Sequence, residues 1–113
     1  MTDPVTTDLR AQIIALLAEV SRGGSADKVA DALRSRDIKG RMSDTCECPI
    51  AHLIKTLPGI DQVDVVNGHV VIWASGVEEP FSVDLTGPLT TFVFLFDQGV
   101  YLDLVQLLPA VSR

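Results

Sequence analysis

The chain has 113 residues, of which 47% are hydrophobic and 21% are charged. This composition is typical of a folded globular protein and excludes an intrinsically disordered one. The sequence contains no apolar run of the roughly 20 residues that a membrane-spanning helix needs, and its polar first residues do not resemble a signal peptide. The net charge of −6 argues against general nucleic-acid binding, which depends on Lys and Arg that neutralise phosphates. We therefore expect one cytoplasmic domain over residues 1–113, without membrane association and with reduced cysteines.

The N-terminal third of the chain predicts two helices. Apolar side chains recur at helical spacing over residues 9–20, and Thr7 or Asp8 is placed to cap the start of this helix. Two glycines end it, and a second helix follows over residues 25–36. Residues 37–45 then form a connection that contains a single glycine.

A third helix is predicted in the stretch that holds both cysteines. Proline is favoured at the first position of a helix, because its backbone nitrogen would have no partner there and its φ is already helical. Pro49 therefore predicts a helix start with Cys48 as the N-cap, and Pro58 marks the end of this helix.

The following segment predicts an antiparallel sheet. Asn67-Gly68 lies between two β-branched runs, residues 61–66 and 69–75. This dipeptide is typical of a type I′ hairpin turn, which needs a positive φ at both central residues. Residues 79–86 alternate apolar and polar side chains and predict a third strand.

The C-terminal part, residues 87–108, is rich in apolar side chains. Its run at residues 92–96 fits either a strand or a helix. We favour a helix that Pro88 opens and that breaks near Gly99, followed by a second short helix over residues 101–108.

The order of elements predicts an α+β fold. Three N-terminal helices, a small antiparallel sheet and one or two C-terminal helices would place the helices on one side of the sheet. Three helices followed by a hairpin also resemble the winged helix-turn-helix family in element order. The resemblance implies a recognition helix at residues 48–57, preceded by a helix at 26–33, with a wing at 63–73 and a nucleic-acid partner. No motif of that family is matched, so no functional residue is carried over.

The cysteine-containing stretch admits three interpretations. Cys46, Cys48 and His52, with His69 as a fourth ligand, would give a tetrahedral zinc site, although the C-x-C spacing is unusual. Alternatively, Cys48 at a helix N-terminus would be a reactive thiol with His52 as its base. The third interpretation is architectural: Cys48 caps the helix and the stretch carries no chemistry.

Charge is distributed unevenly along the chain. Residues 1–41 carry seven Lys or Arg and six Asp or Glu, whereas residues 42–113 carry two and nine. The basic residues near the end of the second predicted helix could contact phosphates or complement that helix's C-terminus: Arg34, Arg36, Lys39 and Arg41. The C-terminal part offers candidates for binding a protein partner: Glu78, Glu79, Asp97, Asp103 and Tyr101.

The sequence contains none of the common catalytic motifs, and its two histidines have no evident catalytic partners. We expect a non-catalytic protein-interaction or regulatory module without a cofactor, acting on a partner protein or on a second copy of itself. A winged-helix-like nucleic-acid-binding regulator is the first alternative, and a thiol or zinc site is the second.

Overall fold

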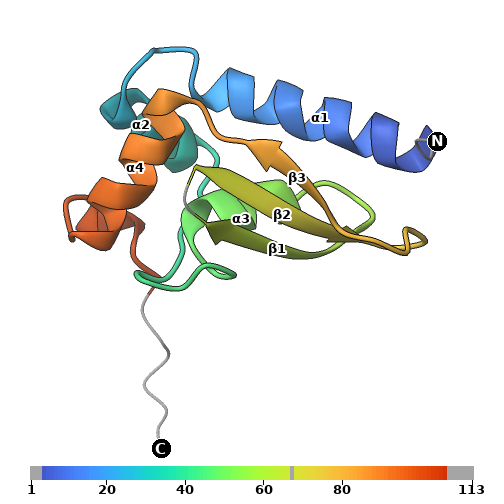
Figure 1. Cartoon of the computed structure of the whole chain (residues 1–113). Coiled ribbons are helices and arrows are strands. Elements are labelled where there is room, and N and C mark those ends of the chain that lie inside the picture. The colour runs from blue at the N-terminus through green and yellow to red at the C-terminus, as the bar shows by residue number, and fades with distance from the viewer. Residues whose placement is uncertain (1–3, 67, 107–113) are drawn as a thin grey trace, which may run out of the picture.

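The computed structural model describes residues 4–66 and 68–106 and confirms the α+β class (Figure 1). Among the described residues, no helix combines the length and the apolar composition that crossing a membrane requires. The elements follow the predicted order up to the last helix: α1 Pro4–Val20, α2 Ala26–Ser35, α3 Pro49–Lys55, β1 Ile60–Val66, β2 His69–Ala74, β3 Phe81–Asp84, α4 Gly87–Asp97 and a 3₁₀ turn, η1, Leu102–Leu104.

The three strands form an antiparallel sheet in the order β1-β2-β3. Val65 is opposite Val70, and Val70 is opposite Val83, so one face of the sheet is continuously apolar and buried. The helix α3 packs against β1 and lies behind the sheet in Figure 1, while α1 runs beside β3. Trp73, on the opposite face, is only half-buried.

A second layer of the core joins α2 and α4, which pack against each other. Phe92 stacks on Phe96 and on Tyr101, with ring centroids 5.9 and 5.2 Å apart. The Tyr101 hydroxyl donates a hydrogen bond of 2.7 Å to Asp27 of α2. Burial, together with this carboxylate, raises the pKa of Tyr101 to about 12. The C-terminal segment is thereby fixed to α2, and the run at residues 92–96 is helical as predicted.

Two predicted boundaries are corrected by the structure. The first helix begins at Pro4, because proline fits the first helical turn, and Asp8 instead accepts a bond of 2.8 Å from Gln12 within the helix. The predicted helix at residues 101–108 is only the short turn η1, and residues 107 and 108 lie outside the described part of the chain. After this turn the backbone pairs with Gly40, which accepts a bond of 2.7 Å from the Gln106 amide.

The C-terminus of α2 yields a stability prediction. Asp37 has a φ of 57°, and the Ile38 amide bonds the Leu33 carbonyl at 3.0 Å, so α2 ends in a Schellman motif with aspartate at the left-handed position. The helix α4 ends in the same way with Gly99, whose φ is 84°. Asp37→Gly is expected to raise the free energy of unfolding by about 0.5–1 kcal/mol, since it relieves the strained φ and removes a negative charge from a helix C-terminus. Urea denaturation measures the gain.

Asp37→Asn separates these two contributions. It removes the charge and keeps a β-carbon at the left-handed position, so it should raise the free energy of unfolding by only about 0.3 kcal/mol. Equal stabilisation by both variants would show that the charge of Asp37, and not its left-handed backbone conformation, lowers the stability of the wild-type chain.

Candidate functional site

The Cys48 thiol is buried at the start of α3 and makes no side-chain capping hydrogen bond. Cys48 is the N-cap of α3, as predicted, and is 3% exposed. Burial raises the pKa of this thiol to about 11, with smaller contributions in the same direction from the charges of Asp97 and Asp44. The backbone amides of Ala51 and Ile50 offset this shift only in part, so the thiol is protonated at neutral pH.

The four residues proposed as metal ligands are not brought together. The Cys46 sulfur faces Asp64 Oδ1 at 3.8 Å, whereas His52 Nδ1 lies 2.5 Å from the Lys39 carbonyl oxygen. His69 belongs to β2 and pairs in register with Asp84 and Val66. Within residues 4–66 and 68–106, no group of three or more His, Cys, Asp or Glu side chains is arranged to hold a metal ion.

His52 takes part in a polar cluster that fixes the loop before α3. Its Nε2 lies 3.2 Å from Glu47 Oε1, and the Lys55 ammonium donates to Glu47 Oε2 at 2.9 Å and to the Cys46 carbonyl at 2.8 Å. Lys55 and, to a smaller extent, His52 hold the pKa of Glu47 below its usual value. These contacts occupy His52, the side chain proposed as a metal ligand or as the base of a reactive thiol.

The two thiols are expected to react at different rates. In the native protein at neutral pH, iodoacetamide should modify the half-buried Cys46 and spare Cys48, because Cys48 is both buried and protonated. Peptide mass spectrometry should show a second alkylation only after denaturation. The Cys46→Ser variant should then take up no label before unfolding, and rapid native labelling of Cys48 would contradict the architectural interpretation.

The basic residues at the end of α2 do not form a free cationic surface. Arg34 donates to Asp103 at 2.6 Å and to Asp31 at 2.7 Å, and Arg36 pairs with Glu19. The other two members, Lys39 and Arg41, are exposed on the connection between α2 and α3. Half of the set proposed for phosphate contact is thus paired with carboxylates within the chain.

The helix α3 is not presented as a recognition helix would be. Five of its seven residues are buried, and it packs against β1. Its two partly exposed side chains, His52 and Lys55, both contact Glu47. The nucleic-acid alternative stays a prediction, and α3 does not present a basic face that could support it.

The candidates for partner binding lie in separate places. Glu78 and Glu79 are exposed on the connection between β2 and β3, while Asp97 ends α4. The carboxylate of Asp103 bonds Arg34, which holds the pKa of Asp103 below its usual value. Tyr101 is buried in the aromatic stack, so its ring serves the core.

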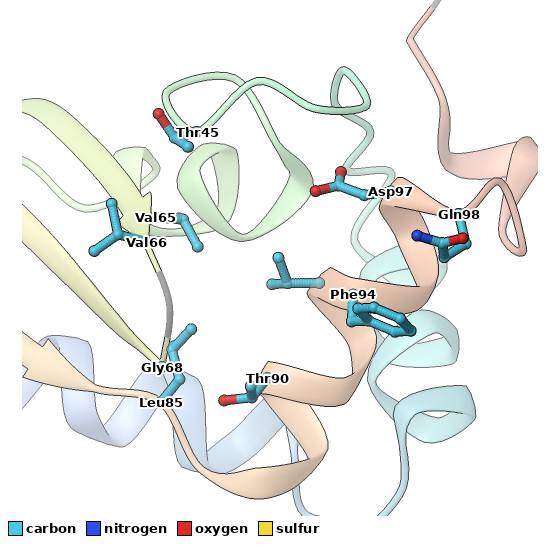
Figure 2. Close-up of a pocket in the computed structure, with 10 residues that line it drawn as sticks. Thr45, Val65, Val66, Gly68, Leu85, Thr90, Phe94, Asp97 and Gln98 are labelled. Atoms are coloured by element: carbon cyan, nitrogen blue, oxygen red, sulfur yellow. The ribbon is translucent and has the colours of Figure 1, made fainter.

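Asp97 borders a groove between α4, the closed end of the β1–β2 hairpin and the loop before α3 (Figure 2). The groove has a volume of about 510 Å³. Side chains from β1 and α4 form its apolar walls, and threonine, glutamine and aspartate side chains contribute the polar groups. We call it the α4 groove, and its lining is Thr45, Val65, Val66, Gly68, Leu85, Thr90, Val93, Phe94, Asp97 and Gln98.

Asp97 is the one charged side chain among the described residues that line the α4 groove. Its Oδ1 accepts a bond of 2.8 Å from the Ser43 amide, which holds the loop before α3 against the end of α4. Ser43 has a φ of 56°, an uncommon value for a residue other than glycine, so this bond supports a locally strained backbone. The position of the Asp97 carboxylate is therefore fixed by the fold.

Exposed apolar side chains gather on α4 and on the segments next to it. Among residues whose burial is described, five large apolar side chains are exposed, and four of them lie on α4, on the turn after it or on the loop beside it. Phe94 is 63% exposed and Leu102 is 68% exposed. Side-chain carbons of Met42 and Leu102 both lie within 4 Å of the position that a β-carbon would take at Gly99, so the loop and the turn are neighbours. We call these four side chains the apolar patch: Met42, Phe94, Val100 and Leu102.

Sequence reasoning identified Asp97 and the apolar C-terminal part of the chain but did not locate the groove or the members of the patch. One available signal was the helical spacing of α4: Phe92 and Phe96 are four residues apart and share the buried face, which leaves Phe94 on the opposite side. Comparisons with models of known protein families, with curated proteins and with solved structures give no match for this chain.

Proposed function

We propose that this chain is a small non-catalytic module that binds another protein through the α4 groove and the apolar patch. The observation that carries the proposal is that four of the five exposed large apolar side chains lie on α4 or on the segments next to it, with Phe94 lining the groove and Met42 and Leu102 as neighbours. Exposed large apolar side chains scattered singly are ordinary, whereas a contiguous group is typical of an interaction site.

The chemistry of the α4 groove favours binding over catalysis. Its described lining contains no histidine, cysteine or lysine, and its single carboxylate, Asp97, already accepts a backbone hydrogen bond. General acid–base catalysis needs a titratable group free to exchange a proton with a substrate. Apolar walls with a few polar groups at the rim are typical of recognition sites.

The charge of this region favours a different protein over a second copy. Residues 42–113 carry nine acidic and two basic side chains, and one of the two basic residues, Lys55, is bonded to Glu47. A symmetric dimer through the apolar patch would bring the Asp97 carboxylates of both copies to the same interface. Like charges at an interface disfavour association, so the surface is better suited to a partner of opposite charge.

A photo-crosslinking residue can test this assignment. The chain carrying p-benzoylphenylalanine at position 94 should form an adduct with one protein in a lysate of cells that naturally produce it. The matched control carries the same residue at position 14, because Ile14 is also exposed and apolar but lies on α1. No equivalent adduct is expected there.

The captured protein must then be purified and tested by calorimetry. It should bind the unmodified chain, and Phe94→Asp should lower the affinity by about tenfold or more, as expected for an aromatic anchor. An adduct only between two copies of the chain, equal adducts from positions 94 and 14, or unchanged affinity of Phe94→Asp would contradict the proposal.

A further inference from the structure

We infer that the α4 groove recognises a peptide segment in which an aliphatic or aromatic anchor stands beside Lys or Arg. The inference rests on the proposed function and specifies the chemistry of the partner. It combines two properties of the same groove, its apolar walls and the negative charge of Asp97 in its lining.

The apolar walls define the anchor. Val65, Leu85 and Val93 come from a strand, a loop and a helix and together line a space of about 510 Å³. A space of this size exceeds a single side chain, so an anchor and part of a neighbouring residue fit together. The methylene stem of a lysine or arginine is itself apolar and can follow such a wall while its charged end stays at the rim.

The negative charge defines the flanking residue. Asp97 stands at the rim, and Asp44 precedes Thr45 on the loop that borders the groove. Both carboxylates act on the same buried neighbour, since each contributes to the raised pKa of the Cys48 thiol. None of the described lining residues is a cation; Lys55 of α3 is bonded to Glu47, and Arg41 is exposed on the loop two residues before Ser43. A cationic side chain from a partner would complement this charge.

Phe94 offers a second contact for a cation. Its ring is largely exposed on the same helix as Asp97 and Gln98 (Figure 2), so a guanidinium of the partner could stack on the ring. The same kind of contact occurs within this chain, where the Arg10 guanidinium lies 5.1 Å from the centroid of Phe81. Arginine is thus well suited to the position beside the anchor.

A displayed library of random dodecapeptides, selected on the intact chain, tests the inference. The selected peptides should share an apolar residue next to Lys or Arg. A synthetic peptide of the consensus should bind more tightly than the same peptide with Lys and Arg replaced by Gln, and its affinity should fall as the salt concentration rises. Fluorescence anisotropy measures both effects.

Two matched pairs of variants locate the binding. Asp97→Asn keeps an acceptor for the Ser43 amide but removes the charge, and it should weaken the basic peptide by roughly threefold to tenfold. Asp61→Asn makes the same chemical change at an exposed position at the other end of the β1–β2 hairpin, keeps an acceptor for the Ser75 hydroxyl, and should leave the affinity unchanged. Phe94→Ala should weaken binding by about tenfold, while Ile14→Ala should not.

The outcomes separate the inference from the proposed function. If the library yields no binder, or its binders are not enriched in basic residues, or Asp61→Asn weakens them as much as Asp97→Asn, the basic peptide is ruled out. The proposed function would still stand if position 94 captures a specific partner. If position 94 also fails to capture one, both are wrong.

Discussion

Replacing Gly40 with alanine is expected to destabilise the fold by about 3 kcal/mol or more, a large share of the total stability of a small domain. Gly40 is buried where the loop before α3 crosses it. An added β-carbon would lie 2.4 Å from the Cys48 carbonyl carbon, 2.4 Å from the Pro49 nitrogen and 2.6 Å from the Glu47 oxygen. All three are backbone atoms, so the clash cannot be relieved by a change of rotamer.

The substitution would also affect the hydrogen bonds that Gly40 makes to the C-terminal segment. The Gly40 amide donates to the Leu104 carbonyl at 2.9 Å, and its own carbonyl accepts from Gln106. Any backbone shift that accommodates alanine would therefore disturb both the start of α3 and the pairing with the C-terminal segment. Thermal and urea denaturation followed by circular dichroism would measure the loss.

Gly87→Ala is the matched control. Gly87 is exposed at the start of α4, and an added β-carbon there meets no atom within 4 Å. The free energy of unfolding of the Gly87→Ala variant should be unchanged or higher by a few tenths of a kcal/mol, because alanine is a better helix former than glycine. Comparable losses in the two variants would show that the close approach at Gly40 does not limit stability.

The elements that could be predicted from sequence are those set by local signals. Pro49 marks the start of α3, and Gly99 closes α4 in a left-handed conformation. Each of these residues determines the backbone conformation of its immediate neighbours in the chain, so no knowledge of the fold was needed. The pairing of Gly40 with Val105 joins residues distant in the chain, and the sequence around each of them gives no sign of the other.

The same distinction explains which site residues were found. Asp97 could be identified by its charge in an acidic region, but the groove beside it is assembled from several elements and from the loop before α3. Tyr101 stands between Val100 and Leu102, which are both exposed, and only the fold shows that its hydroxyl reaches Asp27 while its ring is buried. The cysteine stretch resembled a site because a buried cysteine that packs as a small apolar residue carries the same thiol that binds zinc.

Phe92→Ala is expected to lower the free energy of unfolding by about 3–5 kcal/mol, the usual loss for a buried phenylalanine. Phe92 is fully buried and stacks on both Phe96 and Tyr101, so it joins α4 to the segment that Asp27 of α2 holds. Alanine would leave a cavity between these rings and weaken the attachment of the C-terminal turn. Hydrogen exchange should accordingly show faster exchange at the Leu104 amide than in the unmodified chain.

Phe94→Ala provides the control for Phe92→Ala, since it makes the same chemical change in the same helix two residues away. Phe94 is 63% exposed, so its loss should alter stability by no more than about 0.5 kcal/mol. If Phe94→Ala destabilised the chain as much as Phe92→Ala does, Phe94 would belong to the core and the apolar patch would not be a free surface. A large effect at Phe92 and a small one at Phe94 would instead mean that α4 uses one face to hold the fold and the other to meet a partner. Any loss of binding in Phe94→Ala could then be attributed to the contact itself.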